Sequence, residues 1–432
     1  MGRNAVRIAR LMGILLAAVA LLAPWAADAA KSSKKKKTPG VPHRFYTQTN
    51  NPSGNTVLVY DRRADGTITL LANAPTGGKG QPTPPGTPTF GLPVVDSQGS
   101  VDLTPDGKLL FVVNAGDNTV SSLRVTANGL KLVSHVSSHG KLPVSLASSG
   151  HLLYVLNGLS YSVFGWHFSS TGKLTPIAGS DRKLTAITPK GKKDKNGAPA
   201  AIGFSANGDV LAVTQRALPR KYGEIDTFVI RRDGSAGPSH ATATPGIDNP
   251  FGFSAVGKYF LVSNAGQVNT ANGAMPQVGD FTQFTGTAAT FRVSNAGKLT
   301  LVGNVKTGGR AACWLIVTKN GHRAFVTNTL GATAPTGGVG AVSSLSVAAN
   351  GKMTLSHQAN TGPGFPADMA LSSDNKYLYV IDPSSALSAP PPLGPGIKSQ
   401  IDVYRLGAGG SLTQIQATPA TLPPGISGAG AF

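Results

Sequence analysis

The stretch VDLTPDGKLLFVVNAGDNTVSSLRVTANGLKLV, Val101–Val133, decides the fold. It holds a short apolar segment, an Asp-Gly turn, an apolar segment ending at Asn114, the segment Thr119–Val125, and a last segment after Asn-Gly. Thr119–Val125 alternates apolar and polar residues with period two, which predicts a β-strand. Asp-Gly and Asn-Gly are hairpin signals, because these residues tolerate positive φ. The stretch therefore predicts four antiparallel strands, here called a to d.

The same phrase recurs along the chain. Related copies are PVSLASSGHLLYVLN, AIGFSANGDVLAVTQ, FGFSAVGKYFLVSN, WLIVTKNGHRAFVTN and DMALSSDNKYLYVID, and HRFYTQTNNPSGNTVLVYDRRADGTITL fits from strand b onward. In each copy a polar residue ends strand b: Gln48, Asn114, Asn157, Gln215, Asn264, Asn328 and Asp382. Four-stranded units at this spacing are propeller blades. The sequence predicts an all-β, seven-bladed β-propeller of four-stranded antiparallel blades.

The two ends of the repeat predict how the ring closes. The repeat begins at strand b of blade 1, so that blade lacks its strand a. The final segment LPPGISGAGAF resembles the proline-led starts of other blades, LPVSLAS and FPADMALS. We expect this C-terminal segment to supply strand a of blade 1. The predicted organisation is a signal peptide over 1–29, a basic flexible linker over 30–42 and a propeller over 43–432.

The amino-terminal segment has the pattern of a secretory signal. Arg3, Arg7 and Arg10 precede an apolar run from Leu11 to Ala26, and the small residues of Ala27–Ala29 follow. A positive start, a short apolar run and an Ala-x-Ala site are typical of a signal peptide. The run is shorter than the ~20 residues of a membrane span. We expect an exported protein, periplasmic or extracellular, that is a monomer with no transmembrane span once the signal is removed.

Composition excludes several classes of protein. Charged residues are 13%, about half of the usual ~25%, and 40% hydrophobic residues are enough for a core. Glu224 is the sole Glu, which argues against a mostly helical enzyme or a coiled coil. The single Cys313 excludes an intramolecular disulfide framework, and the eight His are dispersed. We therefore expect no metal and no other cofactor.

The chain is strongly basic. Its formal net charge is +20, and residues 1–29 hold three Arg and one Asp, so +18 remains without them. Such a charge favours acidic polysaccharide, anionic cell surfaces or nucleic acid as partners. The Lys-rich segments Lys31–Lys37 and Lys190–Lys195 have no interleaved aromatic residues. Since stacking aromatics are typical of nucleic-acid sites, we expect no nucleic-acid partner.

Loop lengths distinguish the two faces of the ring. The d–a and b–c connections share one face, here called the upper face, and the a–b and c–d turns lie on the lower face. All the long connections are on the upper face: Ala74–Gly99, Ala178–Ala198, Gln267–Thr287, Gly331–Gly340 and Pro383–Lys398. Loops of this length are uncommon unless they are functional or disordered. We therefore predict a site at the upper mouth of the central channel.

The phrases LTPDGKLLFVVNAGDNTVSSLRV and ALSSDNKYLYVIDP resemble the seven-bladed lactonase family, over about residues 43–432. That family includes propeller-type 6-phosphogluconolactonases and carboxymuconate cyclases, so the resemblance implies lactone chemistry. Its enzymes start blade 6 with Gly-Pro-Arg-His and end strand b with Asn-Glu. The resemblance implies that the Arg binds a carboxylate or phosphate and that the His and Glu are acid–base groups. Aligned on Asn328, these three fall on Cys313, Trp314 and Thr329, so all three depart from the family pattern.

Other residues could replace that site. Arg310 offers a cation, Glu224 in the b–c loop of blade 4 offers a base, and Asp368 starts strand a of blade 7. Predicted substrate-binding residues at the upper mouth are Trp314, Asn114, Asn157, Asn264, Asn328 and Asp382. The alternative for these residues is structural, as turn caps and a packed aromatic. Two functions stay open: hydrolysis of a small-molecule lactone or cyclic ester, and non-catalytic binding of a carbohydrate or a protein.

Overall fold

The computed structural model describes residues 41–81, 97–185, 198–216, 223–266, 285–331, 339–363, 365–382, 399–418, 422–423 and 425–432. The predicted signal peptide and most of the predicted linker, residues 1–40, lie outside the described residues. So do most of the long upper-face connections named above. Within the described ranges, no helix has the length and apolarity needed to cross a membrane.

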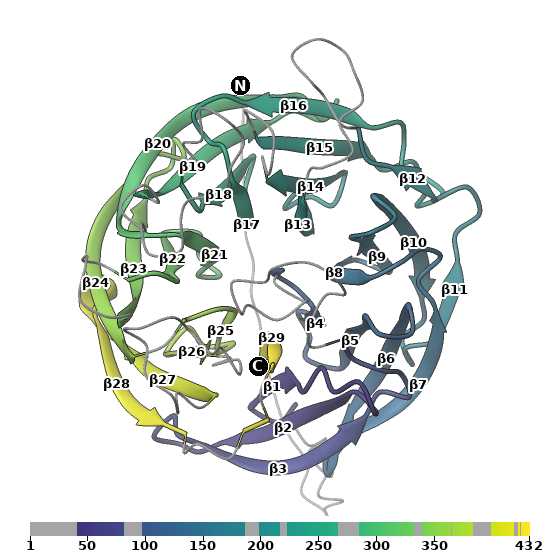
Figure 1. The fold of residues 1–432 in the computed structure, drawn as a ribbon, viewed down its shortest axis with the longest axis horizontal. Coiled ribbons are helices and arrows are strands. Elements are labelled where there is room, and N and C mark those ends of the chain that lie inside the picture. Colours follow the sequence, from purple (N-terminus) through teal and green to yellow (C-terminus); the bar gives the residue numbers. More distant parts are fainter. Residues whose placement is uncertain are drawn as a thin grey trace, which may run out of the picture. The chain divides into compact units, whose positions relative to one another are not determined.

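The unit Val41–Phe432 is a ring of seven antiparallel sheets, as predicted (Figure 1). Each sheet is one blade of four strands, except that blade 3 has a short fifth strand. In each blade, strand a is innermost and strand d outermost. The described residues form no α-helix, and the one helical turn is the 3-10 segment η2 (Ala408–Gly410).

The first four blades have the following strands. Blade 1 contains β29 (Ser427–Ala431), β1 (Arg44–Gln48), β2 (Thr56–Arg62) and β3 (Ile68–Pro75). Blade 2 contains β4 (Val101–Leu103), β5 (Leu109–Asn114), β6 (Thr119–Thr126) and β7 (Gly129–Ser137). Blade 3 contains β8 (Pro143–Ser149), β9 (Leu152–Asn157), β10 (Ser162–Phe168), β11 (Leu174–Pro176) and β12 (Arg182–Lys183). Blade 4 contains β13 (Ala198–Phe204), β14 (Val210–Arg216), β15 (Gly223–Val229) and β16 (His240–Thr244).

The last three blades complete the ring. Blade 5 contains β17 (Pro250–Val256), β18 (Tyr259–Asn264), β19 (Thr285–Val293) and β20 (Leu299–Arg310). Blade 6 contains β21 (Ala312–Val317), β22 (Arg323–Asn328), β23 (Val339–Val347) and β24 (Met353–Pro363). Blade 7 contains β25 (Met369–Leu371), β26 (Tyr377–Asp382), β27 (Gln400–Leu406) and β28 (Leu412–Ala417).

The ring closes in blade 1, as the sequence predicts. Strand β29, from the C-terminal segment, pairs antiparallel with β1, with Phe45 opposite Ala431 and Tyr46 opposite Gly430. Figure 1 shows the yellow β29 beside the purple β1. The backbone N–H of Phe432 extends this ladder by donating to the carbonyl of Arg44 at 2.9 Å. Both ends of the propeller sequence therefore hold one blade together.

The core lies between the blades. The described residues form seven buried apolar clusters. Six of them join residues of two neighbouring blades, and the seventh extends from blade 4 to blade 7. Leu110 and Val112 of blade 2, for example, pack with Tyr46 and Val57 of blade 1. A single four-stranded sheet has two apolar faces and no second layer of its own, so each blade depends on both neighbours for burial.

Short glycine turns occupy the lower face, as the Asp-Gly and Asn-Gly pairs predict. Gly66 in the c–d turn of blade 1 has φ +94°, a conformation that favours glycine. A Cβ at this position would lie 2.0 Å from a ring carbon of Tyr377 in blade 7. This turn therefore needs glycine both for its backbone and for its contact with the neighbouring blade.

Candidate functional site

The polar residues that end each second strand join neighbouring blades. Asn114 is fully buried, and its Nδ2 donates to Ser121 Oγ at 2.8 Å and to Thr119 Oγ1 at 3.1 Å. Its Oδ1 accepts from Thr76 Oγ1 at 2.8 Å and from Asn55 Nδ2 at 3.0 Å, and both of these residues belong to blade 1. The amide of Asn114 therefore uses both of its donors and both of its acceptor positions within the protein.

Asn328 repeats this arrangement in blade 6. Its Oδ1 accepts from Thr307 Oγ1 of blade 5 at 2.7 Å, and its Nδ2 donates to Ser343 Oγ at 2.8 Å. Asn157 donates to the carbonyl of Ser138 in blade 2 at 2.9 Å. Asn264 accepts from the backbone N–H of Asn249 at 2.9 Å. Asn114, Asn157, Asn264 and Asn328 are all buried and bonded, which supports the structural alternative for these predicted binding residues.

A sequence signal for these contacts was missed. The end of strand d reads Thr-Gly-Gly at 76–78, Ser-His-Gly at 138–140 and Thr-Gly-Gly at 307–309. A Cβ on Gly78, Gly140 or Gly309 would lie 2.4 Å from the amide carbon of the next blade's Asn. The hydroxyl residue and the glycine two positions later therefore let strand d cross directly over that Asn.

Blade 7 has carboxylates in the corresponding place. Asp382 is fully buried, and its Oδ1 accepts from the backbone N–H of Phe365 at 3.1 Å. Its Oδ2 is buried with no hydrogen-bond partner among the described residues. Asp402, also fully buried, accepts from Gln414 Nε2 at 2.9 Å. Burial raises the pKa of both carboxyls to about 7, and the charge of Asp402 adds to the shift of Asp382.

Asp368 lies where three segments meet at the upper end of the channel. Its Oδ1 accepts from the backbone N–H of Met369 at 2.9 Å, and its Oδ2 accepts weakly from that of Gly99 at 3.4 Å. The backbone of Ala429 in the closing strand also bonds to this carboxyl. Burial nevertheless raises the pKa of Asp368 to about 7, and the side chain is only 4% exposed. Asp368 therefore changes its charge near neutral pH.

Gln98 lies at the centre of the ring, a position that sequence reasoning missed. Its Nε2 donates to the carbonyl of Phe253 in β17 at 2.8 Å, and its Oε1 accepts from the N–H of Leu315 in β21 at 2.9 Å. Its backbone forms a parallel bridge with Ala201 in β13 and accepts from Ser145 Oγ of β8 at 2.5 Å. One residue therefore bonds to the innermost strands of blades 3, 4, 5 and 6.

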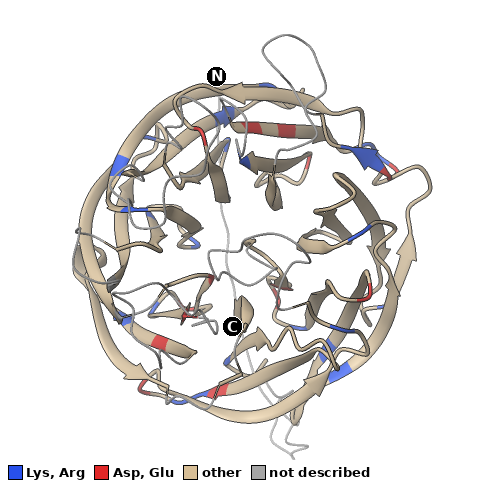
Figure 2. Ribbon diagram, viewed as in Figure 1, with Lys and Arg blue, Asp and Glu red and all other residues tan. Residues whose placement is uncertain are grey.

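Glu224 lies in a strand and not in a loop, so that prediction was wrong. It is the second residue of β15, opposite Gln215, because the pairing of β14 and β15 begins earlier than the sequence pattern indicated. It is 1% exposed, and Gln215 Nε2 donates to its Oε1 at 3.4 Å and also to Asp226. Figure 2 shows the acidic positions on β15, the third strand out from the channel.

Arg310 and Trp314 lie close in sequence but in different surroundings. Arg310 ends β20, is half-buried, and donates from its backbone N–H to the carbonyl of Gly331 at 2.8 Å. Trp314 is 2% exposed, with its ring edge-on to Phe251 at 4.9 Å between centroids. Cys313 is buried in the same cluster. The indole thus packs in the interface between blades, and the structure leaves none of its faces open for stacking.

The predicted catalytic groups are distributed over three blades. Asp368 lies before the innermost strand of blade 7, and Arg310 lies before that of blade 6. These two innermost strands, β21 and β25, lie side by side. Glu224 belongs to blade 4, two strands outward from the channel. The arrangement brings Arg310 and Asp368 to adjacent blade starts and leaves Glu224 apart from them.

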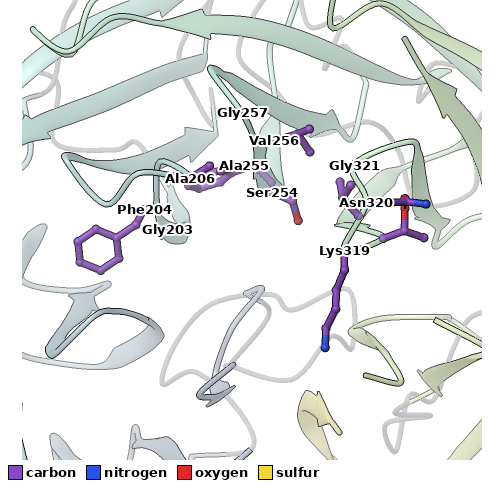
Figure 3. Close-up of a pocket in the computed structure, with 13 residues that line it drawn as sticks. Gly203, Phe204, Ala206, Ser254, Ala255, Val256, Gly257, Lys319, Asn320 and Gly321 are labelled. Atoms are coloured by element: carbon purple, nitrogen blue, oxygen red, sulfur yellow. The ribbon is translucent and has the colours of Figure 1, made fainter. Parts of the chain in front are cut away.

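A cavity of about 510 Å³ lies at the lower end of the channel, opposite the predicted site. It is lined by the lower ends of β13, β17 and β21 and by the turn that holds Lys319 and Asn320. Figure 3 shows Lys319 extending from this turn towards the middle of the ring. Among the described residues, no group of three or more His, Cys, Asp or Glu is placed to hold a metal ion.

Comparisons with known proteins agree with this architecture. A family model described as lactonase, 7-bladed beta-propeller, matches residues 44–179 and 277–419, together more than half of the chain. No curated protein matches the chain. The structure of a putative 6-phosphogluconolactonase from Bacteroides uniformis is similar, with TM-score 0.63, 16% identity, and coverage of 90% of this chain and 99% of that one. The periplasmic gluconolactonase PpgL of Pseudomonas aeruginosa has TM-score 0.61, 17% identity, and coverage of 89% and 98%.

Proposed function

Because the chain belongs to the lactonase family of seven-bladed β-propellers, we propose that it is an exported enzyme that hydrolyses a lactone or a similar cyclic ester. The reaction takes place at the upper mouth of the channel, where blades 6 and 7 begin. The observation that carries the proposal is Asp368, a carboxyl at this mouth whose pKa is about 7. A general base works best when its pKa lies near the working pH.

The chemistry requires a base and a cation. The carboxylate of Asp368 takes a proton from water, and the resulting hydroxide bonds to the carbonyl carbon of the lactone. The ring C–O bond then breaks, and the leaving ring oxygen takes the proton from Asp368, which gives the open hydroxy acid. Arg310, at the start of the adjacent blade, binds the developing oxyanion or an anionic substituent of the substrate. The arrangement replaces the Arg, His and Glu that the resemblance implies for blade 6.

The test is proton release from a panel of sugar and aliphatic lactones by the purified protein. We expect Asp368→Asn to lower kcat/KM by about 10²-fold or more, the usual contribution of a general base. Asp181→Asn is the matched control, because Asp181 is an exposed carboxyl in blade 3, and it should keep full activity. Circular dichroism establishes that each variant is folded. Full activity in Asp368→Asn would refute the assignment of the base.

The second candidate is a non-catalytic propeller that binds a carbohydrate or a protein. One observation favours it: the carboxyl of Asp368 is nearly buried and already accepts backbone N–H groups. A base held in this way must gain exposure before water or substrate can reach it. Absence of turnover across the panel, with a folded protein, would favour this second candidate and lead to glycan and protein binding screens.

A further inference from the structure

The lower face has a second hollow beside the first. It measures about 380 Å³ and lies between blades 4 and 5, lined by Asn207, Lys258 and Asn295 among others. Ala206 and Gly257 line both hollows, so the two are continuous. We call this continuous depression the lower groove. It extends over the turns of blades 4, 5 and 6, on the face away from the proposed lactone site.

The rim of the lower groove is mainly basic, although it includes the exposed carboxylate of Asp209, which accepts from Nδ2 of the lining residue Asn207 at 2.6 Å. Lys258 and Lys319 line it and are exposed. Lys298 follows the Ser294–Asn295 part of the lining, and it too is exposed. Lys352 lies near the same end, because a Cβ on the preceding Gly351 would lie 2.9 Å from a ring carbon of Tyr259, the residue after Lys258. Figure 2 shows basic and acidic positions around the ring, and the full chain has 39 Lys and Arg against 19 Asp and Glu.

The groove also offers neutral hydrogen-bonding groups. Asn320 and Asn295 are exposed amides of two turns, and turn backbone makes up much of the remaining lining. The Oδ1 of Asn320 already accepts from Thr318 Oγ1 and from the backbone N–H of His322, so this residue offers its Nδ2 as a donor. The amide of Asn295 can donate to one hydroxyl group and accept from another. Exposed lysines on separate turns can each bind one negative charge of a polyanion. The large aromatic residues of the lining, Phe204 and Phe253, are nearly buried, so the groove has no stacking surface for nucleic-acid bases.

We propose that the lower groove binds an acidic polysaccharide, a chain of sugars bearing carboxylates. Its hydroxyl groups match the amides and the turn backbone, and its regularly spaced carboxylates match the lysines. The two continuous hollows accommodate an extended chain of sugar units. Such binding holds the protein on a polyanionic surface while the opposite face stays open to small substrates. It is independent of whether the upper mouth hydrolyses lactones.

The test measures binding of polygalacturonate to the full mature protein by titration calorimetry at two salt concentrations. The double variant Lys258→Glu, Lys319→Glu should weaken binding at least tenfold. The matched control is Lys79→Glu, Lys141→Glu, which makes the same change of charge at exposed positions on the upper face. We expect the control to weaken binding no more than about twofold. The Lys-rich amino-terminal segment is present in both variants, so its contribution cancels.

Several outcomes would overturn the proposal. Equal losses in the two double variants would mean that net charge alone attracts the polymer. Equal binding of neutral dextran would exclude a role for the carboxylates. Tighter binding to vesicles of anionic phospholipid than to polygalacturonate would assign this face to a membrane surface. Melting temperatures within 2 °C of the parent protein are expected for both variants, because all four lysines are exposed.

Discussion

Gln98→Ala should lower the free energy of unfolding of the ring more than is usual for a residue that is only half-buried, as Gln98 is. The substitution removes the bonds of Nε2 to the carbonyl of Phe253 and of Oε1 to the N–H of Leu315. Each hydrogen bond contributes about 1 kcal/mol, and a buried backbone group left without a partner costs a further ~1–3 kcal/mol. Leu315 is fully buried, so its N–H is the group left unpaired. We expect a loss of about 3 kcal/mol in the free energy of unfolding.

Gln416→Ala is the matched control for this substitution. The side chain of Gln416, like that of Gln98, accepts one backbone hydrogen bond and donates one. It accepts from the N–H of Ile68 at 2.7 Å and donates to the carbonyl of Ile68 at 3.0 Å. Gln416 lies in β28 at the outer edge of the ring, where water can replace it, so we expect a loss of about 1 kcal/mol. By calorimetry, the Tm should fall by about 4 °C for Gln98→Ala and about 1 °C for the control. Equal shifts for the two variants would refute the central role of Gln98.

Three further predictions concern stability. Burial raises the pKa of Asp382 and Asp402 to about 7 from an ordinary ~3.9. The contribution of these two carboxyls to the free energy of unfolding is therefore fully present below about pH 4, where they are protonated in both states, and is lost as the pH rises through 7. Calorimetry should show a Tm that falls between pH 5 and pH 8 by the equivalent of at least ~1 kcal/mol. Asp382→Asn should make the Tm less dependent on pH. A Tm that rises over that range would contradict the burial argument. Asn328→Ala should cost about 2–3 kcal/mol in urea unfolding, because it removes two buried hydrogen bonds and leaves the hydroxyl of Thr307 without its acceptor. An unchanged midpoint would mean that the blades do not need this contact. Gly66→Ala should lower the Tm by the equivalent of ~2 kcal/mol or more, because the new Cβ would collide with the ring of Tyr377 and because φ +94° is unfavourable for alanine. An unchanged Tm would show that the ring of Tyr377 can move aside.

The repeating phrase was sufficient to predict the architecture. All seven predicted residues at the ends of second strands lie in strand b of successive blades, from Gln48 in β1 to Asp382 in β26. The alternation within each strand and the Asn-Gly and Asp-Gly turns are local signals, so one copy can be read without its neighbours. Closure by Ser427–Ala431 was also predictable, because the opening copy lacks strand a.

Contacts between blades were harder to predict. The partners of Asn114 and Asn328 come from the preceding blade, so their role depends on how two repeats dock. Gln98 bonds to residues more than 150 positions further along the chain, and nothing in the local Ser-Gln-Gly sequence indicates this. Glu224 was placed in a loop because the polar residues before it hide the start of β15.

The candidate site also depends on contacts between blades, which the sequence of one repeat does not show. Asp368 was recognisable as an acid at the start of a blade, but its raised pKa depends on burial beside Gly99 and the closing strand. Trp314 was open to two interpretations from sequence, and its packing against Phe251 from the neighbouring blade supports the structural one. The lower groove was not predicted, because all of its turns are short and resemble ordinary hairpin turns.

The measurement that tests the account most directly is the pH dependence of δ-gluconolactone hydrolysis, followed in a pH-stat and corrected for the spontaneous reaction. The account predicts that kcat/KM rises with pH through an apparent pKa near 7, the value that burial gives Asp368. It also predicts that this rise disappears in a folded Asp368→Asn variant. An unchanged profile in that variant would contradict the assignment of the base, and no turnover by the parent protein would contradict hydrolysis of this lactone itself.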